Sequence, residues 1–179
     1  MNQKLIIGAV VASIIMFVWQ FMAWSIINLH RGNMQYTPNQ DAIMEVLNNN
    51  LEEGSYFIPN LPETATQEEH QAAMENSKGK PWAQITYHKS WEMSMGMNMF
   101  RGWAVDLITM LLFCWILMKI ANLNFKVTLL LSLSVGLIGY LSVNYLGSIW
   151  FETSTLSALI DAIIQWGLIG AWLGWWLNR

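Results

Sequence analysis

The chain has 179 residues, of which 54% are hydrophobic and only 12% are charged, with 11 tryptophans and a formal net charge of -3. A soluble domain has about 25% charged residues, so this composition is typical of a protein whose main solvent is the lipid bilayer. The small negative charge and the lack of a dense lysine or arginine cluster argue against nucleic acid as a partner and against recognition of anionic lipid headgroups.

Four apolar runs are long enough to cross a hydrocarbon core as helices, because a span needs about 20 predominantly apolar residues. They predict an all-α integral membrane protein, a four-transmembrane-helix bundle with a small α+β extracytoplasmic domain between the first and second helices. The predicted boundaries are residues 5–29 for the first span, 30–99 for the loop domain, and 100–121, 127–150 and 155–177 for the remaining spans.

The first span starts close to the N-terminus and has some 25 apolar residues, which is too long for a signal-peptide core, so we expect a retained signal anchor. Charge placement orients the spans. The segments on the side of the two termini contain Lys4, Lys119, Lys126 and Arg179 and no acidic residue, whereas residues 30–99 contain nine carboxylates. The positive-inside rule therefore predicts a multi-pass protein of the bacterial inner membrane with both termini cytoplasmic and residues 30–99 periplasmic.

The 30–99 loop has the patterns of two short helices and two short strands. Asn39 can cap a first helix that ends at Gly54, and Thr66 with Glu69 three residues later is a capping box for a second. Residues 55–58 and 83–87 are rich in β-branched and aromatic side chains, which favours strands. A domain of roughly 70 residues has a marginal core, so we expect it to rest on the outer ends of the spans.

Alternating methionines precede the second span. Met93, Met95, Met97 and Met99 follow His88, and thioether sulfur is a soft ligand suited to Cu(I) when an extended segment presents the sulfurs on one face. A helix would instead divide these methionines between faces, and methionine also fills irregular gaps in packing. Periplasmic copper binding is therefore an alternative hypothesis, and the chain otherwise suggests no cofactor.

Polar residues fall at one depth within the spans. Asp106, Asn144 and Asp161 each lie six residues from the outer end of their span, roughly 9 Å below the boundary at 1.5 Å per residue. A four-residue spacing adds Gln165 to the stripe of Asp161 and Tyr140 to the stripe of Asn144. We predict that these stripes face the interior of the bundle.

This polar layer has two interpretations. The structural one is hydrogen bonding between helices, worth about 0.6 kcal/mol per bond on average, with Arg101 or His30 reaching down as a counter-charge. The functional one is a proton or cation site open to the outside, because intramembrane carboxylates often mark ion routes. We prefer the structural interpretation, since no second polar layer continues toward the cytoplasm. A third hypothesis is a hydrolase in which Asp106 and Asp161 share a proton.

Glycines on the last two spans offer small surfaces on which helices can pack closely. They are Gly136 and Gly139 on the third span and Gly167, Gly170 and Gly174 on the fourth. Gly170 and Gly174 form a GxxxG pattern, which we take as a sign of tight packing and as a candidate contact with another protein.

Several short motifs also give a family resemblance. They are FVWQ at residues 17–20 with AWS at 23–25, GSYFIP at 54–59, Tyr87 with His88 before the second span, and Asp161 in the fourth. On these motifs the chain resembles, over most of its length, a group of small bacterial four-span inner-membrane proteins. The resemblance implies the architecture and brings no activity with it.

The chain has no Ser/His/Asp arrangement, HExxH, phosphate-binding loop or GxGxxG motif. We therefore expect a non-catalytic accessory or scaffolding subunit of a larger inner-membrane complex, in contact with the bilayer and with other membrane subunits or a second copy of itself. The alternative is a small ion or proton transporter, or a sensor, built on Asp106, Asn144 and Asp161.

Overall fold

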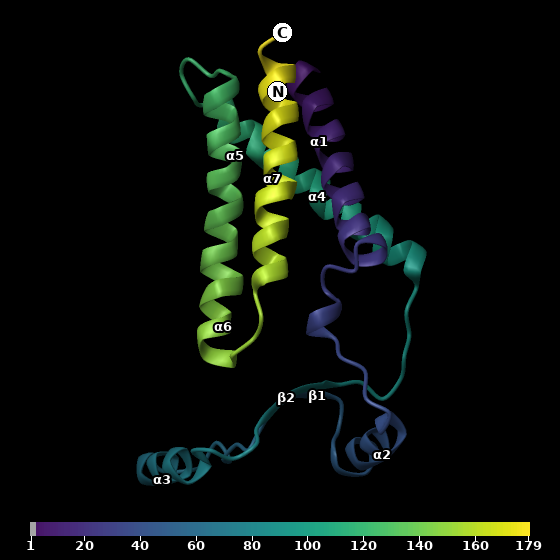
Figure 1. Ribbon diagram of the computed structural model, residues 1–179, viewed down its shortest axis with the longest axis vertical. Coiled ribbons are helices and arrows are strands. Elements are labelled where there is room, and N and C mark those ends of the chain that lie inside the picture. The colour runs from purple at the N-terminus through teal and green to yellow at the C-terminus, as the bar shows by residue number, and fades with distance from the viewer. Residues whose placement is uncertain (1–2) are drawn as a thin grey trace. The chain divides into compact units, whose positions relative to one another are not determined.

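The structure is a computed structural model that describes residues 3–179 (Figure 1). The chain divides into two compact units, which we call the helical unit (residues up to 35 together with 94–179) and the loop unit (residues 36–93).

Four helices of the helical unit are long and apolar enough to span a membrane, which confirms the prediction from the four apolar runs. The first consists of α1 (Gln3–Phe21) and the π-helical turn η1 (Met22–Ile26), and the second is α4 (Met95–Leu117). The third joins α5 (Phe125–Gly139), the π-helical turn η3 (Tyr140–Tyr145) and α6 (Leu146–Phe151), and the fourth is α7 (Leu156–Leu177).

Local signals set the ends of these helices. Asn124 caps α5, because its side chain accepts a hydrogen bond of 3.1 Å from the backbone N–H of Val127. Asn122 and Glu152 adopt left-handed backbone angles, with φ values of 57° and 50°, at the turns before α5 and after α6. Asparagine tolerates this conformation better than most residues, which suits Asn122 to a tight reversal of the chain.

The helices α1 and α7 are central in the packing. α7 packs against α5 and α1, and α1 packs in turn against α4; Figure 1 shows α5 and α7 side by side. The buried core comprises Ala9, Ala12, Met16, Met110, Phe113, Cys114, Leu117, Ile169 and Leu173. The small alanines of α1 let α4 and α7 approach closely, which dispersion contacts between helices require in an apolar medium.

Glycines close the interface between α5 and α7. A Cβ on Gly136 would lie 2.4 Å from Cδ1 of Trp166, one on Gly170 would lie 2.8 Å from Cβ of Ser132, and one on Gly174 would lie 3.0 Å from a ring carbon of Phe125. The GxxxG face of α7 is therefore covered by α5 of the same chain. That face is not available to another protein.

The other two glycines are less constrained. A Cβ on Gly167 would make an ordinary contact of 3.7 Å with Leu133, and one on Gly139 would meet nothing within 4 Å. Gly139 therefore leaves open space beside α5.

Indole N–H groups join the start of α1 to the end of α7. Trp172 donates to the carbonyl of Gly8 at 3.1 Å, and Trp176 donates to the carbonyl of Lys4 at 2.8 Å. The Lys4 ammonium donates to the carbonyl of Leu177 at 3.2 Å. The start of α1 and the end of α7 consequently lie on the same side of the helical unit.

The loop unit consists of α2 (Gln40–Asn50), β1 (Gly54–Ile58), α3 (Gln67–Ser77) and β2 (Ala83–Tyr87). The strands pair antiparallel, from Gly54 opposite Tyr87 to Ile58 opposite Ala83. The capping box of α3 is present as predicted, since the Thr66 hydroxyl accepts from the N–H of Glu69 and the Glu69 carboxylate accepts from the N–H of Thr66.

Two details of the first loop helix differ from prediction. Asn39 occupies the N-cap position of α2 but its side chain makes no capping hydrogen bond. The helix ends at Asn50, because Leu51 already has extended backbone angles, and Gly54 is the first residue of β1. Gly54, which the sequence pattern assigned to the end of the helix, instead pairs with Tyr87 in the sheet.

Candidate functional site

Asp161 on α7 is held by side chains from two other segments. Its Oδ1 accepts a hydrogen bond of 2.9 Å from the indole Nε1 of Trp19, and its Oδ2 lies 2.8 Å from Nε2 of His30. The side chains of His30 and Asp161 are only 11% and 24% exposed. The ring of Trp24 stacks on the imidazole with centroids 4.2 Å apart. Both carboxylate oxygens are therefore engaged, and His30 is the predicted counterpart of Asp161.

The segment that contains His30 is bound to the start of α7 at a second point. Asn33 donates from Nδ2 to the hydroxyl of Ser157 at 3.2 Å. The segment begins at Asn28, which has a left-handed φ of 55°, and passes through the short 3-10 helix η2 (Arg31–Asn33). It then leads directly into the loop unit, which starts at residue 36.

Asp106 on α4 belongs to a different helix interface. It is 5% exposed, its Oδ1 accepts from Nε2 of Gln20 at 3.1 Å, and its Oδ2 is buried with no hydrogen-bond partner among the described residues. Gln20 and Trp19 are neighbours on α1, so they point about 100° apart around its axis. The two aspartates consequently bond to different faces of α1 and are not arranged as a pair that shares a proton, as the hydrolase hypothesis required.

Arg101 is not the counter-charge of Asp106. The two residues line a shallow cavity of about 560 Å³ together with Gln20 and Asn98, but no ion pair joins Arg101 to a carboxylate within residues 3–179. Arg101 is exposed near the start of α4. Its long side chain can keep the guanidinium in water there, which removes the need for a partner.

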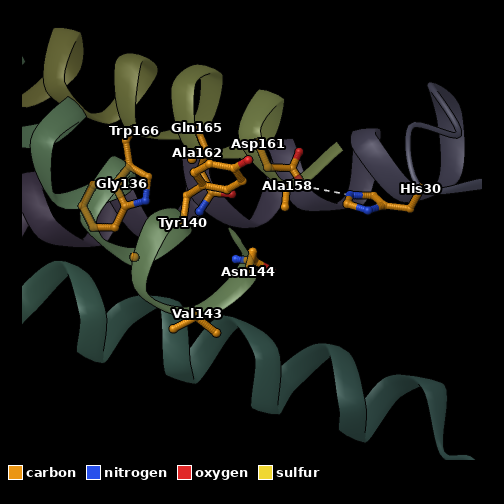
Figure 2. Close-up of a pocket in the computed structure, with 11 residues that line it drawn as sticks. His30, Gly136, Tyr140, Val143, Asn144, Ala158, Asp161, Ala162, Gln165 and Trp166 are labelled. Atoms are coloured by element: carbon orange, nitrogen blue, oxygen red, sulfur yellow. Dashed lines mark hydrogen bonds and ion pairs between the residues drawn. The ribbon is translucent and has the colours of Figure 1, made fainter. Parts of the chain in front are cut away.

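A cavity of about 410 Å³ lies between α7 and the α5–η3 segment (Figure 2). Its lining comprises His30, Gly136, Gly139, Tyr140, Val143, Asn144, Ala158, Asp161, Ala162, Gln165 and Trp166. Four of these positions are glycine or alanine, so small side chains create the space. The site thus brings together all four residues of the two predicted polar stripes and leaves out Asp106, the remaining residue of the predicted polar layer.

A second cavity of about 670 Å³ adjoins the first, because both are lined by His30, Asn144 and Ala158. The rest of its lining is rich in hydroxyl and amide groups: Trp24, Gly32, Asn33, Gln35, Thr153, Ser154, Thr155 and Ser157. Tyr140 and Thr155 connect the two walls through a hydroxyl contact of 3.0 Å. We call the two cavities the inner and the outer cavity; the inner one is the more apolar.

Two π-helical turns shape this site. Residues Tyr140, Val143 and Asn144 come from η3, and Trp24 comes from η1. A π turn has i to i+5 hydrogen bonds, so it adds a residue to the turn and shifts the positions that follow. As a result Asn144 is exposed at the side of the cavity, whereas Tyr140 is buried. The four-residue spacing predicted both on one buried face, because nothing in the sequence signals the wider turn.

The methionine segment does not form the predicted extended face. Met95 is the first residue of α4, so Met97 points roughly 200° away from Met95 and from Met99. Met93 precedes the helix, and the Nδ1 of His88 lies 2.8 Å from a carboxylate oxygen of Glu53. These sulfurs are not aligned as the copper hypothesis required.

The rest of the described structure also has no cluster of metal-ligating side chains. Within residues 3–179, no three His, Cys, Asp or Glu side chains lie close enough together to hold a metal ion.

Comparisons with protein-family models, with curated proteins and with solved structures gave no match.

Proposed function

We propose that this protein is a non-catalytic accessory subunit of a bacterial inner-membrane assembly, and that it acts as a sensor whose ligand occupies the inner cavity. The main support for this proposal is the contact of 2.8 Å between Nε2 of His30 and Oδ2 of Asp161. His30 lines both cavities and also belongs to the segment that joins α1 to the loop unit. An occupant of the cavity would compete with or reinforce this contact and so change how firmly the segment is held on α7.

The proposed orientation places the four apolar helices across the membrane with both termini cytoplasmic and residues 30–99 periplasmic. The charge bias of the sequence supports it, as does the position of the start of α1 and the end of α7 on one side of the helical unit. With Cys114 replaced by alanine, a cysteine placed at Asn60 should react with an impermeant maleimide added from outside. Labelling of a cysteine at Asn122 under the same conditions would overturn the orientation.

A transporter requires a path across the bilayer, and the packing below the cavity argues against one. Ile169 and Leu173 follow Gln165 at four-residue intervals on the same face of α7, and both are 0% exposed. They belong to the apolar core shared with α1 and α4. On the facing helix α5 the buried hydroxyls of Ser132 and Thr128 both donate to backbone carbonyls, so they do not extend the inner cavity as a polar path, which favours binding without passage.

Catalysis by paired carboxylates also lacks support. A pair that shares a proton must lie within hydrogen-bond distance, and the two intramembrane aspartates bond to different faces of α1. Asp161 has both oxygens engaged by neighbouring side chains. A role in holding helices and the connecting segment is the chemistry that these carboxylates support.

Site-specific cross-linking in cells tests the sensor proposal. A photoreactive amino acid in place of Trp91, which is 85% exposed in the loop unit, should capture a defined membrane partner. His30→Phe keeps a ring beside Trp24 but removes the bond to Asp161, and it should change the yield of that cross-linked product. His70→Phe is the matched control, because His70 is exposed on α3. Equal yields in the wild type and both variants would contradict the proposal.

A further inference from the structure

Gln165 is an unpartnered amide that lines the inner cavity. Its side chain is on α7, one turn below Asp161, and only 8% of its surface is exposed. Its amide has two donors and one carbonyl acceptor and forms no hydrogen bond within residues 3–179, yet it is not among the fully enclosed unpartnered groups, so it is open to the cavity that it lines. Figure 2 shows Gln165 beside Tyr140 at the wall of the cavity. A mostly buried amide that is open only to a cavity can form hydrogen bonds with a molecule that enters it.

The charges around the cavity favour a neutral ligand. Asp161 is the one carboxylate of the lining, and both of its oxygens already accept or share a hydrogen bond with Trp19 or His30. No lysine or arginine lines the inner cavity, and the imidazole of His30 already faces Asp161, so an anionic group would lack an unengaged cationic partner. The polar side-chain groups of the lining that have no hydrogen-bond partner within residues 3–179 include the amides of Gln165 and Asn144 and Nδ1 of His30. Amides bind carbonyl and hydroxyl oxygens through ordinary hydrogen bonds.

The shape of the cavity favours a molecule that comes from the bilayer. Its volume of about 410 Å³ is in the range of small-molecule sites, and its wall includes the apolar side chains of Val143 and Trp166. Val143 and Gly139 belong to the exposed side of the third apolar helix, which is the side that lipid chains cover if the helix spans a membrane. A ligand with a polar head at Gln165 could thus extend an apolar tail between these residues.

We propose that the ligand of the inner cavity is a neutral membrane amphiphile whose head group carries carbonyl or hydroxyl oxygens, and that Gln165 binds this head group. Isoprenoid quinones and diacylglycerols share this chemistry. The inference rests on the proposed sensor function and adds the class of molecule that is sensed. Asn144 provides the second amide, at the boundary with the outer cavity.

The test is equilibrium binding to the full chain in lipid nanodiscs. The ligands are a decyl-tailed benzoquinone, dioctanoylglycerol and, as the cationic comparison, tetraphenylphosphonium, each radiolabelled. Gln165→Leu removes the amide at similar volume, and Gly139→Leu fills a wall position at which a Cβ meets nothing within 4 Å. Gly147→Leu is the matched control, because a Cβ there is equally unobstructed and the residue does not line the cavity.

We expect one of the two neutral ligands to bind saturably, with affinity reduced at least tenfold in Gln165→Leu and Gly139→Leu and unchanged in Gly147→Leu. Which neutral ligand saturates distinguishes a quinone site from a diacylglycerol site. Saturable binding of tetraphenylphosphonium that both cavity variants abolish would overturn the ligand class and leave the sensor proposal standing. Equal, non-saturating uptake of all three ligands by all four proteins would also overturn the ligand class, whereas the sensor proposal itself fails if the cross-linking yields are equal in the wild type and the variants.

Discussion

The bond between His30 and Asp161 leads to a quantitative prediction about the outer end of α7. Nε2 of His30 lies 2.8 Å from Oδ2 of Asp161, and the two side chains are 11% and 24% exposed. The pair is therefore better shielded from solvent than a surface ion pair, which contributes about 0.2–1 kcal/mol. Hydrogen bonds inside membrane proteins average about 0.6 kcal/mol and reach about 1.7 kcal/mol. The stacked ring of Trp24 fixes the imidazole, which places this bond in the upper part of that range. We therefore expect a coupling free energy of about 1–1.7 kcal/mol.

A double-mutant cycle measures this coupling. His30→Phe and Asp161→Asn are made singly and together, and the free energy of unfolding is determined in mixed detergent micelles. Asparagine keeps an oxygen that can accept from Trp19 and replaces the charged Oδ2 that faces His30 by an amide NH2, so the cycle measures the part of the His30 bond that depends on the carboxylate charge. His30→Phe should destabilise the wild type by about 1–2 kcal/mol and the Asp161→Asn variant by much less. A coupling below about 0.3 kcal/mol would refute the reasoning, because that is within the additivity of independent sites.

Three further predictions concern single positions. Gly136→Ala should reduce the free energy of unfolding by about 1–3 kcal/mol in the same micelle assay, because its Cβ would overlap the ring of Trp166. Gly139→Ala should be neutral or stabilising by up to about 1 kcal/mol, because its Cβ would meet nothing within 4 Å. Equal effects of the two substitutions would contradict the packing of α5 on α7. Asp106→Asn should leave stability within about 0.5 kcal/mol, since the unpartnered oxygen gives up no bond, and a loss above about 1.5 kcal/mol would show that the carboxylate is paired. The bond from the backbone N–H of Thr66 lowers the pKa of Glu69 below its ordinary value of 4.5. A lowered pKa means that the cap stabilises α3 above pH 4.5 and is lost as the pH falls through the lowered pKa, so the amide hydrogens of the first turn of α3 should exchange faster on acidification, after correction for intrinsic rates, in the wild type but not in Glu69→Gln.

Features that depend on local hydrogen bonding could be predicted from the sequence. The four apolar helices follow from run length, because a backbone in lipid has to satisfy its own N–H and C=O groups and a helix does so within one segment. The capping box at Thr66 and Glu69 is equally local, since it joins residues three apart. The depth of Asp161 along α7 follows from the helical rise alone, and with it the expectation of a polar partner such as His30.

The direction in which each side chain points around its helix axis was decided by the tertiary structure. Gln20 and Trp19 are adjacent in sequence, yet they bond to aspartates on two different helices, because α1 lies between α4 and α7. The turn η3 moves Asn144 off the stripe that a period of 3.6 residues predicts. The glycines of α7 could pack against many different helices, and in the tertiary structure Gly170 and Gly174 pack against α5. The sequence of one segment determines how far along the helix each side chain lies. Which helix packs on each face depends instead on the free energy of packing all the segments together, so it cannot be read from one segment alone.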